Sequence, residues 1–202
     1  MKLYSTSAAR NKEIIADAFH RLLPSAAHVL ELASGTGEHA EAILAARPRL
    51  GWQASDPDEE ARASVSARMG ELGQAPAMSF DTRTNRWWKD IREPIDTVVS
   101  INMIHITSWV GVEGLFQGMG ALLGDGGHLF LYGPMKRQGL TEESNQQFDQ
   151  SLKLRDPSWG VRDLDDELQP LAARFGLSLS HAERVPANNH IVLFKKVVHG
   201  EN

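Results

Sequence analysis

The chain has 202 residues, 42% hydrophobic and 23% charged, which is enough apolar material for one domain with a sizeable core. Its 21 Lys and Arg against 26 Asp and Glu give a formal net charge of -5, which disfavours nucleic acid and anionic membranes as partners. The absence of cysteine excludes disulfides, thiolate nucleophiles and cysteine-ligated metals, and it fits a cytoplasmic protein.

No segment has the pattern of a targeting or membrane-spanning sequence. The N-terminal residues lack the apolar stretch of a signal peptide, and polar residues interrupt the most apolar segment, 97–112. We therefore expect a soluble, unprocessed protein.

Short apolar runs alternate with segments of helical spacing along the chain, which is typical of β-α units. The first half is expected to contain helices over 7–23, over 39–47 and after residue 57, and strands over 29–33 and 52–55. Strands over 75–80 and 95–101, a helix over 112–123 and a strand over 128–132 are expected next. The chain is expected to end with a helix over 163–175 and strands over 177–185 and 190–197.

Only four residues, 186–189, separate the last two strands, so this pair must be antiparallel. The sequence predicts a single domain over 1–202 with a doubly wound, three-layer α/β/α fold. Its seven-stranded, mostly parallel sheet ends with one antiparallel strand. A polar insertion over about 134–162 is longer than a crossover needs, and we expect it to cover the carboxyl edge of the sheet as a lid.

Ligands of open α/β sheets bind at the carboxyl ends of the strands. After the first predicted strand, Glu31 lies four residues before Gly35 of a Gly35-Thr36-Gly37 turn. Such glycines allow the backbone to approach a ligand, and the following helix offers free N–H groups. Alone, this pattern is also typical of an ordinary strand-to-helix turn.

Two further acids follow the next two predicted strands. Asp56 is placed to accept hydrogen bonds from a ribose diol, and Asp81 from an adenine amine. The alternative for Asp56 is a helix N-cap, which does not exclude the first role. Three acids after three successive strands, with the glycine turn among them, favour a site for an adenosine cofactor.

Two adenosine cofactors fit this pattern, a nicotinamide dinucleotide and S-adenosylmethionine (SAM). A pyrophosphate disfavours a neighbouring carboxylate such as Glu31, whereas the ammonium and sulfonium of SAM favour it. Ala40 also stands where a dinucleotide motif has its third glycine. Because some dinucleotide motifs have alanine there, this observation only supports the preference for SAM.

The strings VLELASGTGEH and WQASDPDEE, with Asp81 and the final antiparallel pair, resemble a class I SAM-dependent methyltransferase over 29–196. One departure is Ala33, where many members have glycine. A narrower resemblance, to the methyltransferase-like protein twenty-six family, rests on the strings AARNKEII, INMIHITSW, YGPMKRQG, SNQQFDQSLKLRDPSWGVRD and PANNHIVLFKK. The cofactor-binding residues expected are Arg10, Glu31, Ala33, Ser34, Gly35, Gly37, His39, Asp56, Pro57, Asp81, Thr82, Asn102 and Met103.

Methyl transfer is an in-line displacement, and it needs a base only where the acceptor must lose a proton. Enzymes that methylate amide or exocyclic nitrogens resemble one another in an Asn/Asp-Pro-Pro-aromatic tetrapeptide, which this chain lacks. We expect a small-molecule acceptor, with His105 as base and Tyr132 as the orienting hydroxyl. The alternatives are a packed histidine and a core tyrosine.

The acceptor site is predicted from polar residues of the N-terminal segment, the insertion and the final turn, namely Tyr4, Asn11, Lys12, Asn145, Phe148, Trp159, Arg162, Asn188, Asn189 and His190. Arg10, Lys12 and Arg162 suit an anionic acceptor. Trp87 and Trp88 are expected to pack in the core. The histidines show no pair at ligand spacing, so no metal is predicted.

These expectations describe a cytoplasmic SAM-dependent methyltransferase that acts on a small molecule. Two alternatives stay open: a nicotinamide-dependent oxidoreductase, which Glu31 disfavours, and a non-catalytic SAM-binding sensor or partner subunit. The sequence leaves the oligomeric state open.

Overall fold

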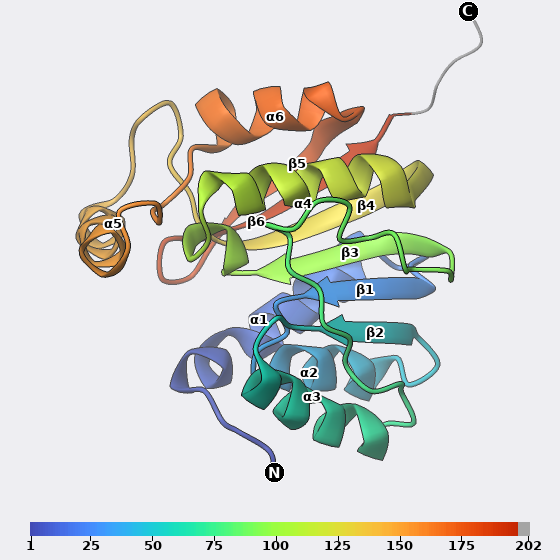
Figure 1. Cartoon of the computed structure of the whole chain (residues 1–202). Coiled ribbons are helices and arrows are strands. Elements are labelled where there is room, and N and C mark those ends of the chain that lie inside the picture. The colour runs from blue at the N-terminus through green and yellow to red at the C-terminus, as the bar shows by residue number, and fades with distance from the viewer. Residues whose placement is uncertain (198–202) are drawn as a thin grey trace, which may run out of the picture.

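The computed structural model describes residues 1–197 and contains one six-stranded sheet with the strand order β2-β1-β3-β4-β6-β5 (Figure 1). The strands are β1 (His28–Leu32), β2 (Gly51–Ser55), β3 (Ile95–Ile101), β4 (Leu123–Pro134), β5 (Leu177–Val185) and β6 (Asn189–Lys196). The first four are parallel, and β6 runs antiparallel to both β4 and β5. The mixed sheet and its terminal antiparallel pair are confirmed.

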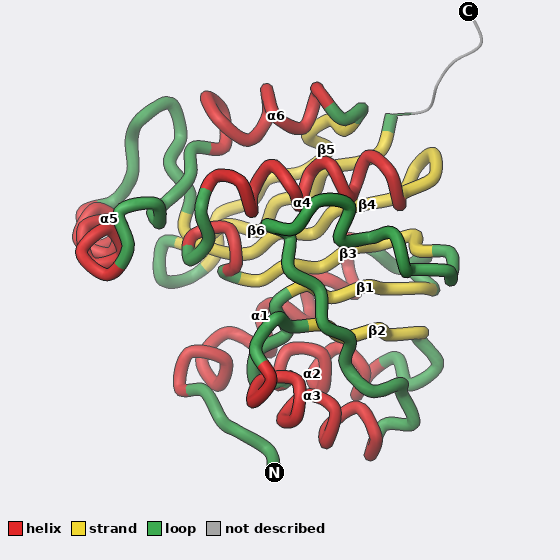
Figure 2. Tube along the Cα trace, in the orientation of Figure 1, coloured by secondary structure: helices red, strands yellow, loops and turns green. Residues whose placement is uncertain are grey.

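The predicted strand over 75–80 does not form, so the sheet has six strands and not seven. This segment makes a single bridge, between Met78 and Ser55 at the edge of β2. Pro76 has no N–H to donate to a ladder, and Phe80 turns away to pack against Trp87. Figure 2 shows the long loop that connects α3 to β3 here.

Helices cover both faces of the sheet. α1 (Thr6–Leu22), α2 (Glu38–Ala46) and α3 (Glu59–Glu71) lie on one face, and α4 (Trp109–Leu122), η2 (Leu164–Leu168) and α6 (Gln169–Arg174) on the other (Figure 1). Alternate residues of β4 serve the two layers: Leu129 and Leu131 face α4, whereas Phe130 and Tyr132 face α1. Trp87 is buried in the α4 layer and Trp88 packs against it, as predicted.

Two helices differ from expectation. α4 begins three residues earlier than predicted, after Ser108. The helix predicted over 163–175 is a π-helical turn, η2, followed by the short α6, because Pro170 lacks the N–H that a continuous α-helix requires. Within residues 1–197 no helix combines the length and apolarity needed to cross a bilayer.

The insertion contains a helix of its own, α5 (Glu143–Arg155), which stands beyond the carboxyl ends of β3 and β4 (Figure 1). The short turn η1 (Met103–His105) follows β3 at the same edge. The carboxyl ends of β1 to β4, η1 and α5 therefore surround one region of the molecule.

Candidate functional site

The turn between β1 and α2 depends on glycine for two different reasons. A Cβ on Gly37 would lie 2.8 Å from Cγ2 of Val65, so glycine lets α3 approach closely. Gly35 has φ +55°, and a Cβ there would meet no atom within 4 Å. The open side of the turn is therefore at Gly35, where a ligand has access to the backbone. Ala33 keeps a left-handed φ of +57°, which explains why glycine suits this position better.

Glu31 lies beneath this turn and is only 1% exposed. Trp52 Nε1 donates a hydrogen bond to its Oε2 at 3.2 Å. Burial raises the pKa of Glu31 to about 7, hydrogen bonds from Ser34 and Trp52 oppose that shift, and the nearby Asp56 adds to it. Neither hydrogen-bond partner is a cation, so no positive charge offsets the burial of this carboxyl group.

The raised pKa predicts that Glu31→Gln stabilises the protein at alkaline pH. A folded-state pKa above that of the unfolded chain means that folding binds the proton, so stability falls as the pH rises from 4.5 through 7. We expect the variant to exceed wild type by about 3 kcal/mol in free energy of unfolding at pH 8 and to match it at pH 4.5. Urea unfolding at the two pH values measures this, and an equal difference at both would contradict it.

Asp56, which is 7% exposed, connects the end of β2 to the glycine turn. Its carboxylate accepts hydrogen bonds from the backbone N–H of Gly35 at 2.9 Å and of Asp58 at 2.9 Å. Asp58, and not Asp56, caps α3 by accepting from Ala61 N at 2.8 Å. The helix-cap alternative for Asp56 is thus wrong, and its carboxylate lies beside the open side of the turn.

Asp81 follows a loop and not a strand, so three acids do not end three successive strands. Arg83 Nε and Nη2 bind its carboxylate at 2.7–3.1 Å. The Arg83 side-chain hydrogen bonds lower the pKa of Asp81 below its usual value, although burial opposes this. An adenine amine would have to share this carboxylate with Arg83, which the sequence reasoning did not consider.

The remaining predicted cofactor residues vary in burial. Ser34 is buried, and its hydroxyl accepts from Ser55 N at 3.1 Å. Thr82 and Met103 are also buried, whereas Pro57 and Arg10 are exposed. The ring of His39 contacts Asn11 Oδ1 at 2.9 Å, and burial lowers the pKa of His39 to about 4.

Two buried charged residues near the turn were missed. Arg68, 2% exposed, donates to Thr36 O at 2.9 Å, to Glu41 Oε2 at 2.7 Å and to Leu3 O at 2.6 Å. The buried Glu38 accepts from Ser5 N at 2.7 Å and from the Thr36 hydroxyl at 2.9 Å. Arg68 and Glu38 therefore tie the N-terminal segment to the glycine turn.

A cavity of about 390 Å³ lies at the carboxyl edge of the sheet, between α1, α5 and the β5–β6 turn. We call it the first cavity; it is lined by Ser7, Asn11, Asn102, Tyr132, Pro134, Ser144, Asn145, Phe148, Ala187 and Asn189. It brings together five of the residues predicted for the acceptor side, Asn11, Tyr132, Asn145, Phe148 and Asn189. Burial raises the pKa of Tyr132, and a hydrogen bond with Asn11 opposes the shift.

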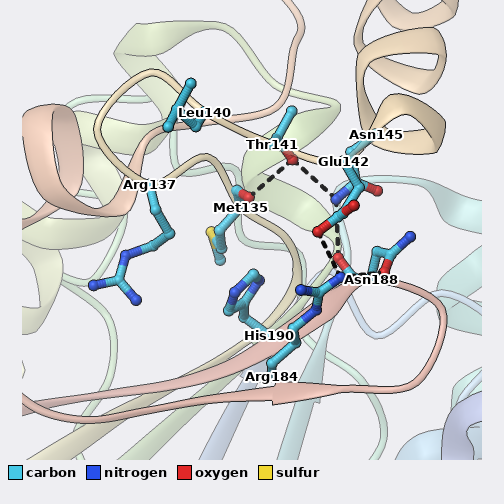
Figure 3. Close-up of a pocket in the computed structure, with 9 residues that line it drawn as sticks. All are labelled: Met135, Arg137, Leu140, Thr141, Glu142, Asn145, Arg184, Asn188 and His190. Carbon is cyan, nitrogen blue, oxygen red and sulfur yellow. Dashed lines mark hydrogen bonds and ion pairs between the residues drawn. The ribbon is translucent and has the colours of Figure 1, made fainter.

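A second cavity, of about 270 Å³, adjoins α5 (Figure 3). It is lined by Met135, Arg137, Leu140, Thr141, Glu142, Asn145, Arg184, Asn188 and His190. Asn145 belongs to both cavities, and its amide nitrogen donates to Asn188 O at 2.9 Å. Asn188 and His190, which were predicted to bind the acceptor, thus line this second cavity instead of the first.

Four residues predicted to bind the acceptor line neither cavity. Tyr4 is 77% exposed and lies against Arg68, and Trp159 lies against Arg155. Arg162 donates hydrogen bonds to the backbone carbonyl oxygens of residues 104, 107 and 158 at 2.7–3.0 Å, so its guanidinium connects three backbone segments. Lys12 is also outside both cavities. The basic residues predicted for an anionic acceptor therefore do not face the first cavity.

His105 lies behind the wall of the first cavity and is fully buried. A Cβ on Gly133 would collide with its Nε2 and would lie 3.2 Å from Asn102 Oδ1, so Gly133 makes room for the imidazole. Neither ring nitrogen has a partner in hydrogen-bond geometry. Burial, and then Arg162, lower the pKa of His105 to about 3, which keeps the ring neutral at physiological pH.

Among residues 1–197, no group of three or more His, Asp or Glu side chains is arranged to hold a metal ion.

The fold is shared with solved methyltransferases of class I. The mitomycin 7-O-methyltransferase MmcR is 15% identical, with a TM-score of 0.80 over 95% of this chain and 55% of that chain. Human N-acetylserotonin methyltransferase (ASMT), in complex with SAM, is 14% identical, with a TM-score of 0.76 over 95% and 53%. An O-methyltransferase family 2 protein from Planctomyces limnophilus DSM 3776, in complex with apigenin, is 19% identical, with a TM-score of 0.73 over 95% and 60%. The chain therefore has a class I methyltransferase fold and spans little more than half the length of these structures.

A family model described as "Protein of unknown function (DUF938)" matches residues 2–196. The chain thus belongs to the DUF938 family.

Proposed function

We propose that this chain is a SAM-dependent methyltransferase that methylates a small molecule held in the first cavity. The observation that carries the proposal is the buried carboxyl group of Glu31, without a cationic partner, beneath a glycine turn whose open side also faces Asp56. The fold shared with solved O-methyltransferases supports it, and so does the narrower resemblance to the methyltransferase-like protein twenty-six family.

The residues present fit the cofactor. Glu31 has no positively charged partner, and the ammonium and sulfonium of SAM would supply one. Asp56 is placed to accept hydrogen bonds from a ribose diol. The open space at Gly35 leaves room for the cofactor against the backbone. A pyrophosphate would add charge of the same sign as Glu31, which disfavours a nicotinamide dinucleotide. When bound, SAM supplies an electrophilic methyl group.

The chain's own part in the reaction is to hold and orient the acceptor. Tyr132 and the amides of Asn11, Asn102 and Asn145 line the first cavity and orient the acceptor. His105, the base predicted from the sequence, lies behind Asn102 and lines neither cavity, and its low pKa makes it too weak a base to take the proton of an acceptor hydroxyl.

The acceptor proposed is a neutral polar molecule. No side chain that lines the first cavity carries a charge, and seven of its ten residues offer a neutral hydroxyl or amide, whereas Pro134, Phe148 and Ala187 are apolar. An anion buried there would lose its hydration without a counter-charge, which is costly. This replaces the anionic acceptor expected from Arg10, Lys12 and Arg162.

Calorimetric titration with SAM, S-adenosylhomocysteine and NAD tests the cofactor assignment. We expect saturable binding of the first two, which Asp56→Ala weakens about 100-fold because charge-assisted hydrogen bonds worth about 3 kcal/mol are lost. Asp58→Ala is the matched control, since Asp58 caps α3 next to Asp56 but does not contact the turn.

The titration also separates the alternatives. Binding of NAD alone would overturn the proposal in favour of an oxidoreductase. Tight SAM binding without turnover of any neutral hydroxyl compound would favour a sensor or partner subunit.

A further inference from the structure

We propose that the second cavity is a binding site for a small oxyanion, a carboxylate or phosphate group. It lies beside α5 and is separated from the first cavity by Asn145, which lines both. The two cavities differ in charge: the first has no charged lining residue, and the second is lined by Arg137, Arg184 and Glu142.

Basic groups reach the second cavity from three different segments. Arg137 comes from the segment after β4, Arg184 from β5 and His190 from β6, and Figure 3 shows the two guanidinium groups on either side of the His190 ring. Guanidinium groups match the geometry of carboxylate and phosphate, because their N–H donors lie in one plane.

Each arginine already has an acidic partner but keeps unused donors. Arg137 binds Asp165 through Nε and Nη2 at 2.7 and 3.0 Å. Arg184 binds Glu142 and Asn188 through Nη2 at 2.7 and 2.6 Å. Among the described residues, Nη1 of each arginine has no acceptor, so both retain an N–H pair for an additional anion.

His190 contributes a polar atom without a partner to the second cavity. Its Nδ1 is buried and has no hydrogen-bond partner among the described residues. Burial lowers the pKa of His190, and Arg137 and Arg184 lower it further. An oxyanion in the cavity can accept hydrogen bonds from Nδ1–H and from the unused N–H donors of the two guanidinium groups.

The N-terminus of α5 adds further hydrogen-bond donors beside the second cavity. The helix has 13 residues and begins beside the cavity, after Glu142, whose side chain does not cap it. Its free N–H groups favour a nearby anion. This site does not depend on the proposed methyl transfer, because none of its charged groups faces the first cavity.

The test is an NMR titration of the His190 imidazole with inorganic phosphate and with acetate, at constant ionic strength set with NaCl. The resonance is assigned by its loss in His190→Gln. We expect a saturable response and an increase of about one unit in the pKa of His190, because the bound anion favours the imidazolium.

Arg184→Gln should weaken phosphate binding roughly tenfold, since it removes a charged hydrogen-bond donor. Arg174→Gln is the control, because Arg174 pairs with Glu113 on the surface and does not line the cavity. A response that grows linearly with phosphate, or one that Arg184→Gln leaves unchanged, overturns the proposal. Neither result bears on SAM binding, so the two proposals fail separately.

Discussion

Replacing Arg68 with methionine is expected to lower the free energy of unfolding by about 3–5 kcal/mol. The guanidinium is 2% exposed and satisfies the carbonyl oxygens of Leu3 and Thr36 and the carboxylate of Glu41. Methionine fills much of the same volume but donates no hydrogen bond, so these partly buried acceptors lose their partner. We also expect weaker SAM binding, because Thr36 is the middle residue of the glycine turn.

Urea unfolding and calorimetry measure the two effects. Arg68→Lys should lose less stability but not regain wild-type affinity, because one ammonium group does not reproduce a planar fork that reaches three acceptors. Arg21→Met is the control, since Arg21 forms an exposed ion pair with Glu183 and its loss should cost less than about 1 kcal/mol. A loss that small for Arg68→Met would contradict the structural role.

The order of strands and helices was largely predictable because each follows from local pattern. The antiparallel final pair follows from a loop too short for a crossover, and the two layers follow from the continuous apolar run of β4, whose successive residues are buried on opposite faces. The wrong prediction of a strand over 75–80 also has a local cause. The apolar run suggested a strand, but Pro76 has no N–H to donate to a neighbouring strand.

The candidate site was predictable where its residues follow strands directly. Asp56 and the glycine turn meet because parallel strands bring their carboxyl ends to one edge. The roles of Arg68 and Arg162 were not predictable, since each guanidinium binds carbonyl groups more than 50 residues away along the chain. A charged residue in a polar segment resembles a ligand-binding or solvated residue until its long-range partners are known.

The burial of His105 predicts a specific response to acid. The folded-state pKa of about 3 lies below the ordinary value of 6.5, so unfolding favours protonation, and stability present above pH 6.5 is lost as the pH falls toward 3. From pH 7 to pH 4, wild type should lose about 3 kcal/mol more in free energy of unfolding than His105→Gln, whose side chain does not titrate. His39, with a pKa of about 4, contributes equally to both proteins and cancels in the comparison.

The same burial and low pKa make His105 a poor general base. Because the imidazole carries no proton to lose between pH 5 and 8, kcat/KM for a neutral hydroxyl acceptor should show no acidic limb near 6.5. His105→Gln should therefore leave kcat and SAM affinity within about threefold of wild type, since the ring faces Asn102 and Gly133 and lines neither the first cavity nor the glycine turn. An imidazole resonance that titrates near 6.5, or a kcat that falls about 100-fold in His105→Gln, would show that the ring reaches the acceptor and acts as its base.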